Sequence, residues 1–443
     1  MHGKLNKDAV GYFLTYQFVP KPIELVQGMP NMPSSENPGI WHYTGNAKEL
    51  DIGEEKASEL IYEKLKTVIS KLIPDGPIGL MMSAGIDSVS ILHVLRELTD
   101  KDIYTITGSF EEGSEKLGIA KRVSKEYGTK HKEIIIGHKS LLRLRGLYDR
   151  IELPVGDNGF LQHFLMMERL KENTDVIFSG DGADCVFSAL DAHFFNYIDQ
   201  TIFNGIDINV PKGYEGWKVK FFIDVRRRFR GFEHYKFGEI FLSDDEKGRV
   251  LTNPPKSLKT PLIEETSKVT DKDIIKRQIA LDFNFYIKNK YDSYILKPSI
   301  LNRVKTFTPY MEKDFVELVM KIPSTYFIKG TEKKHIFRLA MNGRLPDAVL
   351  NKKKEGFSPP FGTWYRKQRG FMKGILDEAR ETGLFRTTYL EALEDSIGVD
   401  VGYEDGMRLW LIMNFMLWYK TVSYTHLRAH ETSLHLVCRL LLE

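Results

Sequence analysis

Short apolar runs alternate with amphipathic stretches over residues 57–190. The amphipathic stretches place leucine, isoleucine and valine three or four positions apart, the spacing of one helix face. The apolar runs are short and bounded by turn-forming or charged residues, which is typical of buried strands. Strands separated by helices imply right-handed βαβ units, and therefore an α/β fold with a doubly wound parallel sheet. We predict helices over 57–72, 89–98, 115–127 and 160–170, and strands over 78–82, 103–107, 131–136 and 176–178.

The segments outside residues 57–190 have other patterns. Residues 1–56 are loop-rich, with five prolines between positions 20 and 38, and are predicted to form a leading segment. Residues 191–290 lose the alternation and are predicted to be an irregular aromatic and basic insert. Helical patterns dominate 291–421, the predicted helical C-terminal part. Its last helix, over 407–419, is rich in aromatic and aliphatic residues, so it belongs to the core or binds a partner.

Charge and composition narrow the class of protein. The 443 residues carry 63 Lys+Arg against 60 Asp+Glu, a net charge of +3, which favours neither a nucleic-acid nor a membrane partner. The run Arg226–Arg230 is either a nucleic-acid patch or a solvated face, and the acidic residues around it favour the second. Two cysteines cannot form a disulfide framework or a structural zinc site. No signal peptide or membrane-spanning run is readable, so we expect a cytoplasmic protein.

Residues 422–443 need a separate explanation. They contain His426, His430, His435 and Cys438, whose spacing could bring metal ligands to one helix face. However, Val-Ser-Tyr-Thr-His-Leu is the translation of DNA that resembles a transposase sequencing adapter, and the next residues continue it in frame. We therefore expect natural coding to end near Thr421 and the tail to have no functional role.

The loop after the first strand has the features of a phosphate site. It reads Ser83-Ala-Gly85-Ile-Asp87-Ser88 and leads into a helix. Gly85 lets backbone approach a ligand, and the helix start offers free amide groups and a positive dipole end. Asp87 would need a cation in such a site, and Mg²⁺ bound to phosphate is the natural one. The alternative is a small-residue turn that its own Asp or Ser caps.

A second strand end has a similar composition. The strand at 176–178 leads into Ser179-Gly180-Asp181-Gly-Ala-Asp184. Two strand ends can converge on one crevice of a doubly wound sheet, so Asp87 and Asp184 could share Mg²⁺. The alternative is again a glycine turn with aspartate caps.

A third loop carries three consecutive lysines, at 352–354, followed by Glu-Gly-Phe-Ser-Pro-Pro360. The lysines are either solvated or reach a triphosphate or a developing oxyanion.

These loops together resemble the synthetase domain of the asparagine synthetase family. Residues 83–88 are similar to its Ser-Gly-Gly-x-Asp-Ser pyrophosphate loop, and 179–184 to its Ser-Gly-Glu/Asp-Gly-Ala/Gly-Asp segment. Residues 110–131 resemble its linking stretch, and 354–358 the loop with its catalytic lysine. The likeness extends over about residues 8–420. It implies a doubly wound sheet like that of the adenine nucleotide alpha hydrolases.

The resemblance implies roles for individual residues. They are as follows: Ser83, Gly85, Asp87 and Ser88 hold pyrophosphate; Met82 and Thr107 contact adenosine; Ser179 and Gly180 approach the nucleotide; Asp181 assists the acyl-adenylate step; Asp87 and Asp184 bind Mg²⁺; and Lys354 stabilises developing charge. The implied cofactors are ATP and Mg²⁺. The implied partners are a small carboxylate substrate and an ammonia donor.

The chain also departs from the family pattern. Ala84 replaces a glycine, which is free of strain only if its φ stays negative. Cys185 replaces a glutamate. The segment Lys305-Thr-Phe307-Thr-Pro-Tyr-Met-Glu312 lacks the family's Glu-x-Arg. The chain as given also lacks the family's glutaminase domain, so we expect it to use free ammonia, a separate glutaminase or an amine in the substrate.

The expected function is an ATP-dependent amide ligase that adenylates a carboxylate, most simply converting aspartate to asparagine. One alternative is a specialised ligase that amidates or cyclises a secondary metabolite, peptide or glycan precursor. Another is a degenerate nucleotide-binding protein without turnover.

Overall fold

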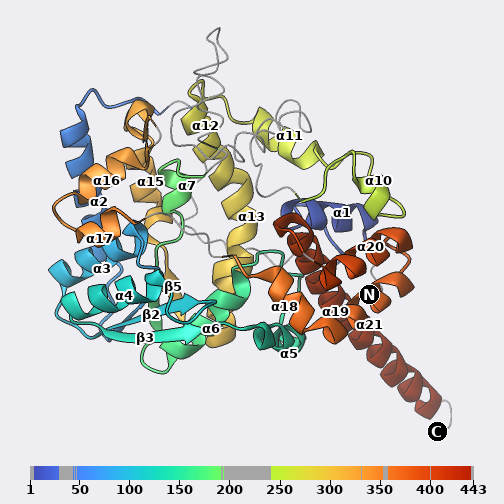
Figure 1. The fold of residues 1–443 in the computed structure, drawn as a ribbon. Helices are drawn as coiled ribbons and strands as arrows, with labels where there is room; N and C mark the ends of the chain where they lie inside the picture. Colours follow the sequence, from blue (N-terminus) through green and yellow to red (C-terminus); the bar gives the residue numbers. More distant parts are fainter. Residues whose placement is uncertain are drawn as a thin grey trace.

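A computed structural model describes residues 4–28, 43, 45, 47–190, 193, 241–330, 332–352, 358–399 and 401–440, with side chains described up to residue 422. Its main sheet has five parallel strands in the order β3-β2-β1-β4-β5 (Figure 1). Their bounds are Ile78–Met81 (β1), Ile103–Ser109 (β2), Lys130–Ile135 (β3), Val176–Ser179 (β4) and Lys305–Phe307 (β5). The strand order reverses between β1 and β4, and this switch point is where open α/β sheets bind ligands.

Side chains along β1 alternate between two cores, as the pleat of a strand requires. Leu80 packs in the core that includes Ile61 of α2 and Val89 of α3. Met81 packs in a separate core with Met167 of α6 and Ile177 of β4. The sheet is therefore covered on both faces, and the prediction of a doubly wound α/β fold with a helical C-terminal region is confirmed.

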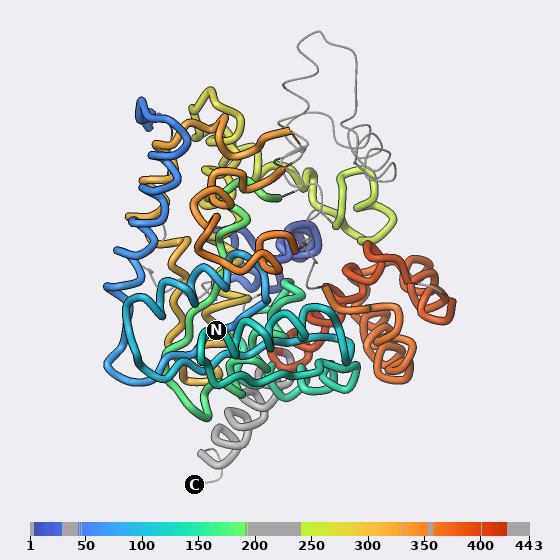
Figure 2. The backbone as a smooth tube through the Cα atoms, turned by 60° about the vertical axis from the view of Figure 1, so that its left-hand side comes forward, coloured from blue at the N-terminus to red at the C-terminus, as the bar shows by residue number. Residues whose placement is uncertain are grey.

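Helices make up most of the remaining described chain (Figures 1 and 2). Before and around the sheet they are α1 Lys7–Tyr16, α2 Glu54–Ser70, α3 Ile86–Leu98, α4 Glu115–Glu126, α5 Arg143–Leu147, α6 Phe160–Lys171 and α7 Ala183–Val186. Next come α10 Lys247–Val250, α11 Thr260–Ser267, α12 Ile274–Leu281, α13 Lys288–Tyr291, α14 Lys297–Asn302 and α15 Lys313–Val319. The chain continues with α16 His335–Met341, α17 Asp347–Leu350, α18 Phe361–Lys367, α19 Arg369–Glu381, α20 Thr387–Gly398 and α21 Tyr403–Leu440.

The leading segment docks on the C-terminal helices. α1 shares a core with α18–α21, in which Phe13, Trp410 and Phe415 are fully buried. Trp410 donates a hydrogen bond from Nε1 to the carbonyl of Gly156 at 3.0 Å. This burial agrees with the core interpretation of residues 407–419.

The structure differs from the sequence predictions in three places. α1 lies in the leading segment predicted to be loop-rich, and Asn6 caps it by accepting from the amides of Asp8 and Ala9. Helices α11–α14 occupy much of residues 260–302, where irregular structure was expected in part. β5 was not predicted, because an edge strand of three residues that is exposed at Lys305 carries no apolar run.

None of the helices in the described part of the chain is long and apolar enough to span a membrane.

Replacing Gly156 with Ala tests the docking of the leading segment. A Cβ at Gly156 would lie 2.1 Å from the carbonyl oxygen of Gln17, so the two backbones would have to separate. We expect Gly156→Ala to lower the free energy of unfolding by about 2–3 kcal/mol, measured by urea denaturation. Gly137→Ala is the matched control, because no atom of the described residues lies within 4 Å of its Cβ position. Equal effects of the two variants would contradict the assigned contact.

Candidate active site

The first predicted loop joins β1 to α3 at the switch point. Ser88 Oγ accepts a hydrogen bond from the amide of Ser83 at 3.0 Å and lies 3.2 Å from Ser83 Oγ. α3 begins at Ile86 with Gly85 as its N-cap, and no side chain caps it. No side chain of the described residues caps the first turn, which is an arrangement suited to an anion. Ser83 Oγ accepts from the amide of Gly85 at 3.4 Å, so the alternative of a turn whose own serines bind its amides holds for the part of the loop that precedes the helix.

Ala84 is strained in this loop. Its φ is +57°, in the left-handed region. The condition for a strain-free alanine, a negative φ, is therefore not met, and the conformation costs about 1–2 kcal/mol.

The second predicted loop follows β4 and lies against the first. A Cβ at Gly180 would come within 3.1 Å of the Ser88 amide nitrogen and 3.2 Å of Asp87 Cβ, so the two loops are in close contact. Gly182 has a φ of +93°, and a Cβ there would lie 2.5 Å from Met311 Cγ. Among the described residues, no side chain caps the four-residue helix α7. The two loops converge as the sequence analysis predicted.

A lysine that the sequence analysis missed connects these loops. Lys334 Nζ lies 2.5 Å from Asp87 Oδ1 and 2.8 Å from Asp184 Oδ1, and its side chain is 6% exposed. Burial opposes the charge of Lys334, but attraction to Asp184 and Asp87 outweighs it, so its pKa is raised. The two carboxylates predicted to bind Mg²⁺ thus face one cation position.

Lys334 is positioned by the elements on both sides of it. It follows the hairpin of β6 (Ile328–Lys329) and β7 (Glu332–Lys333), has a φ of +57° and precedes α16. Phe337 of α16 stacks on Phe187, with ring centroids 4.4 Å apart. The sequence contains one indication of this role, because Lys333 and Lys334 stand directly before a helix. The positive end of a helix dipole disfavours a lysine there unless a carboxylate neutralises its charge.

Tyr310 fixes the first loop from the β5 side. Its hydroxyl donates to the backbone carbonyl of Asp87 at 2.8 Å. The segment that departs from the family pattern therefore lies directly beside the site.

Asp181 is paired inside the crevice. Its Oδ2 accepts from Ser179 Oγ and lies 3.3 Å from Nε2 of His163, which the sequence analysis also missed. Burial raises the pKa of Asp181, but attraction to His163 and hydrogen bonds from His163 and Ser179 outweigh it, so the pKa is lowered.

Met82 and Thr107, predicted to contact adenosine, are adjacent but buried. Thr107 Oγ1 donates to the Met82 carbonyl at 2.6 Å, and the residues are 0% and 1% exposed, respectively. In this conformation neither side chain is open to a ligand.

Several predicted features lie outside the described residues. These are the loop at 353–357 with Lys354, the run Arg226–Arg230, and the side chains of His426, His430, His435 and Cys438.

The site fits a Mg²⁺ ion that is completed by its substrate. The described residues form no group of three or more His, Cys, Asp or Glu side chains suited to a metal. Mg²⁺ in nucleotide sites, however, commonly takes one or two carboxylates, with phosphate oxygens and waters as its other ligands. Asp87 and Asp184 supply two such carboxylates, and the position between them is taken by the ammonium of Lys334 in this conformation, so an ion bound to both carboxylates would displace that ammonium.

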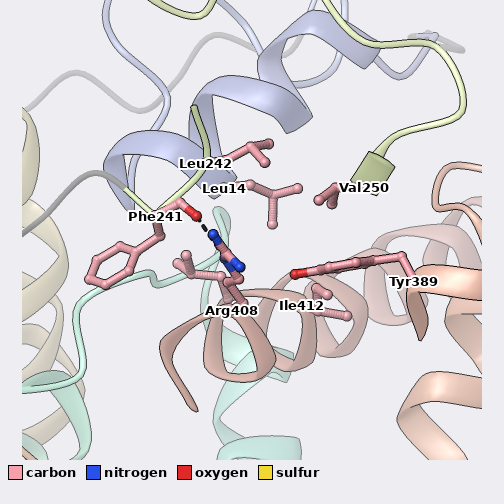
Figure 3. Close-up of a pocket in the computed structure, with 8 residues that line it drawn as sticks. Leu14, Phe241, Leu242, Val250, Tyr389, Arg408 and Ile412 are labelled. Carbon is pink, nitrogen blue, oxygen red and sulfur yellow. Dashed lines mark hydrogen bonds between the residues drawn. The ribbon is translucent and has the colours of Figure 1, made fainter. Parts of the chain in front are cut away.

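A separate cavity lies between α1, residues 241–250, α20 and α21 (Figure 3). Its volume of about 10 Å³ is at the lower limit for a single water molecule, and its walls are mostly apolar. Arg408 lines the cavity, and its Nε donates a hydrogen bond to the carbonyl of Phe241 at 2.9 Å. No predicted site residue lines this cavity.

Replacing Lys334 with Met tests the ion bridge. We expect Lys334→Met to lower the free energy of unfolding by about 3–5 kcal/mol, because two partly buried carboxylates lose their cation. Mg²⁺ should raise the melting temperature of this variant more than that of the wild type. Lys71→Met, which breaks an exposed 2.9 Å pair with Asp314, should change little. A Lys334→Met loss no larger than that of Lys71→Met would rule out the bridge.

Replacing Ala84 with Gly tests the loop strain. We expect Ala84→Gly to stabilise the fold by up to about 1 kcal/mol, because glycine adopts a positive φ freely. Ala120→Gly, at a buried position in α4, should destabilise it instead. Thermal unfolding of both variants measures the difference, and the same sign for both would contradict the strain.

Comparisons with known proteins agree with the resemblance. The family model described as asparagine synthase matches residues 62–420. The chain is 20% identical to asparagine synthetase [glutamine-hydrolyzing] 1 of Bacillus subtilis, over 94% of this chain and 69% of the relative. It is 24% identical to a putative asparagine synthetase [glutamine-hydrolyzing] 2 of Methanocaldococcus jannaschii, over 44% of this chain and 40% of the relative. A solved NH3-dependent NAD synthetase from Campylobacter jejuni aligns with 46% of this chain and 99% of that one, at 12% identity; the TM-score of 0.24 lends no support to a shared activity. The chain belongs to the asparagine synthase family, which confirms the recognition from sequence and makes it a ligase that forms carbon–nitrogen bonds.

Proposed function

We propose that the chain adenylates a substrate carboxylate with ATP and then transfers ammonia or an amine to it, most simply converting aspartate to asparagine. One observation carries the proposal: Asp87 and Asp184 face a single cation position beside the uncapped start of α3. Such a site supplies an anion-binding helix end and carboxylates for a phosphate-bound metal together.

The reaction would proceed in two balanced steps. A carboxylate oxygen attacks the α-phosphorus of ATP, and pyrophosphate leaves. The amine nitrogen then attacks the carbonyl carbon of the acyl-adenylate, AMP leaves with the carboxylate oxygen, and the nitrogen loses its proton.

The chain's own groups would act on the charge that these steps move. The first-turn amides of α3, with Ser83 and Ser88, would hold the pyrophosphate. Lys334 would balance the negative charge that collects there. Lys354 remains the proposed group for the acyl-adenylate or its tetrahedral intermediate.

Asp87 and Asp184 would hold Mg²⁺. When bound, the ion would withdraw negative charge from the phosphate oxygens.

The acceptor side supports a second candidate, a specialised ligase with another carboxylate. Phe307 takes the place of the family's arginine and packs on Phe178, with ring centroids 5.5 Å apart. Lys305 lies over the ring of Phe307 at 4.8 Å. Aspartate carries two carboxylates and favours a cation at its site; the cation here is the ammonium of Lys305 on the Phe307 ring and not the family's arginine, so a carboxylate with another arrangement of charge is the second candidate. Free ammonia, a separate glutaminase or a substrate amine remain the proposed nitrogen sources.

Pyrophosphate release with ATP, Mg²⁺, ammonium and a panel of carboxylates tests the proposal. Labelling the active carboxylate with ¹⁸O should place one labelled oxygen in AMP, because that oxygen bridges the adenylate. Release without label transfer would contradict adenylation. ATP binding without release for any carboxylate would favour the non-catalytic alternative.

Replacing Asp87 with Asn tests the metal role. We expect Asp87→Asn to lower Mg²⁺-dependent pyrophosphate release by at least about 100-fold while the fold survives. Asp102→Asn serves as control, because the Asp102 carboxylate forms an exposed pair with Lys130 at 2.7 Å. An unchanged rate in Asp87→Asn would refute the role.

A further inference from the structure

His163 of α6 lies between two oxygen atoms that can only accept hydrogen bonds. Its Nδ1 is 2.8 Å from the carbonyl oxygen of Gly159, and its Nε2 is 3.3 Å from Asp181 Oδ2. The side chain is 12% exposed, so water offers little replacement. A carbonyl and a carboxylate oxygen have no proton to donate. Because the lowered pKa of Asp181 keeps its carboxyl group ionised, both ring nitrogens must carry a proton, which makes the ring an imidazolium.

His93 shows that a neighbouring carboxylate alone does not impose this state. Its Nε2 lies 3.5 Å from Glu97, but its Nδ1 lies 3.2 Å from the hydroxyl of Tyr127, which can donate as well as accept. A neutral ring therefore satisfies both neighbours. Burial lowers the pKa of His93 accordingly. For His163, burial also works against the charge, but attraction to Asp181 outweighs it and the pKa is raised.

The other titratable groups around His163 have their charges accounted for. Asp157 pairs with Lys290 at 2.8 Å and accepts the amide of Gly159 at 2.6 Å. The ring of Tyr294 lies 5.8 Å from the imidazole, and burial raises its pKa well above the ordinary value, so it is neutral. Asp184, which acts on Asp181 through its charge, pairs with Lys334. Asp181 is thus the carboxylate that His163 neutralises.

The same pairing orients Asp181. His163 and Ser179 both bind Oδ2, and no described residue forms a hydrogen bond with Oδ1. Asp181 directly follows Gly180, which packs against Asp87 and Ser88. The oriented carboxylate therefore lies beside the proposed nucleotide site.

We propose that His163 is a positioning residue that, as an imidazolium, fixes the orientation of Asp181 and cancels its charge. The pairing stands on geometry, and its consequence for turnover rests on the proposed function. When His163 loses its proton, the ring can donate to only one of its two neighbours. Asp181 then adds an uncompensated negative charge beside the ATP phosphates, and adenylation slows. Activity should therefore fall as pH rises through the pKa of His163.

The charge state is measured without substrate by NMR titration of protein labelled with ¹³C at histidine Cε1. The His163 signal is assigned by its absence in His163→Gln, and His93 is the internal reference. We expect His163 to titrate above the ordinary pKa of about 6.5, and Asp181→Asn to lower that pKa by about one unit, a tenfold loss in proton affinity. A His163 pKa at or below that of His93 would overturn the pairing.

The positioning role is measured by the pH profile of pyrophosphate release. The wild-type rate should fall through the pKa that NMR gives for His163. His163→Gln keeps a hydrogen-bond donor but has no charge. Its rate should therefore not fall at this pH, and below this pH it should be lower than the wild-type rate. His93→Gln should keep the wild-type pH profile. A His163→Gln profile that still falls at that pH would overturn the role. No release by the wild type with any carboxylate would count against the proposed function, while the titration would still decide the pairing.

Discussion

The contact of Lys334 with Asp87 and Asp184 is the interaction on which the site depends. It brings a single buried cation to two carboxylates that come from two different strand ends. Burying these charges separately would cost far more than burying them together. The close approach of Gly180 to Asp87, the stacking of Phe337 on Phe187 and the Tyr310 hydrogen bond all serve to keep the three groups within reach. The crevice itself exists because the sheet reverses its order between β1 and β4.

The sequence was informative where local pattern decides structure. Buried parallel strands are short apolar runs, so β1 to β4 were predictable, and the rule that ligands bind at strand ends predicted that Asp87 and Asp184 would meet. Lys334 and His163 could not be found in this way. Lys334 is 247 residues from Asp87 in the chain, and a lone histidine on a helix has no pattern that names its partner. β5 was missed because pairing with β4, and not its own composition, makes it a strand.

The departures from the family pattern affect the two halves of the site differently. On the phosphate side, Ala84 keeps the backbone conformation that glycine would adopt and tolerates the strain. At the position of the family's arginine, Phe307 packs on Phe178, so an aromatic contact stands where the family has a charged side chain. The loop proposed to bind phosphate thus keeps the family's backbone conformation, while the segment at 305–312 differs from the family in both sequence and packing.

The pairing of β4 with β5 has a consequence for how the protein is made. Val176 and Lys305 are partners in the sheet, and the whole of residues 180–304 lies between the two strands. During synthesis, β4 must leave the ribosome long before its outer neighbour exists. Until then the strand presents unpaired backbone groups at the edge of a half-built sheet, which is the kind of surface that recruits other chains. If translation stalls between residues 180 and 304, the incomplete chain therefore has an unpaired edge strand and is prone to aggregate. The yield of folded protein should depend on uninterrupted elongation and on chaperones that cover the unpaired edge of β4.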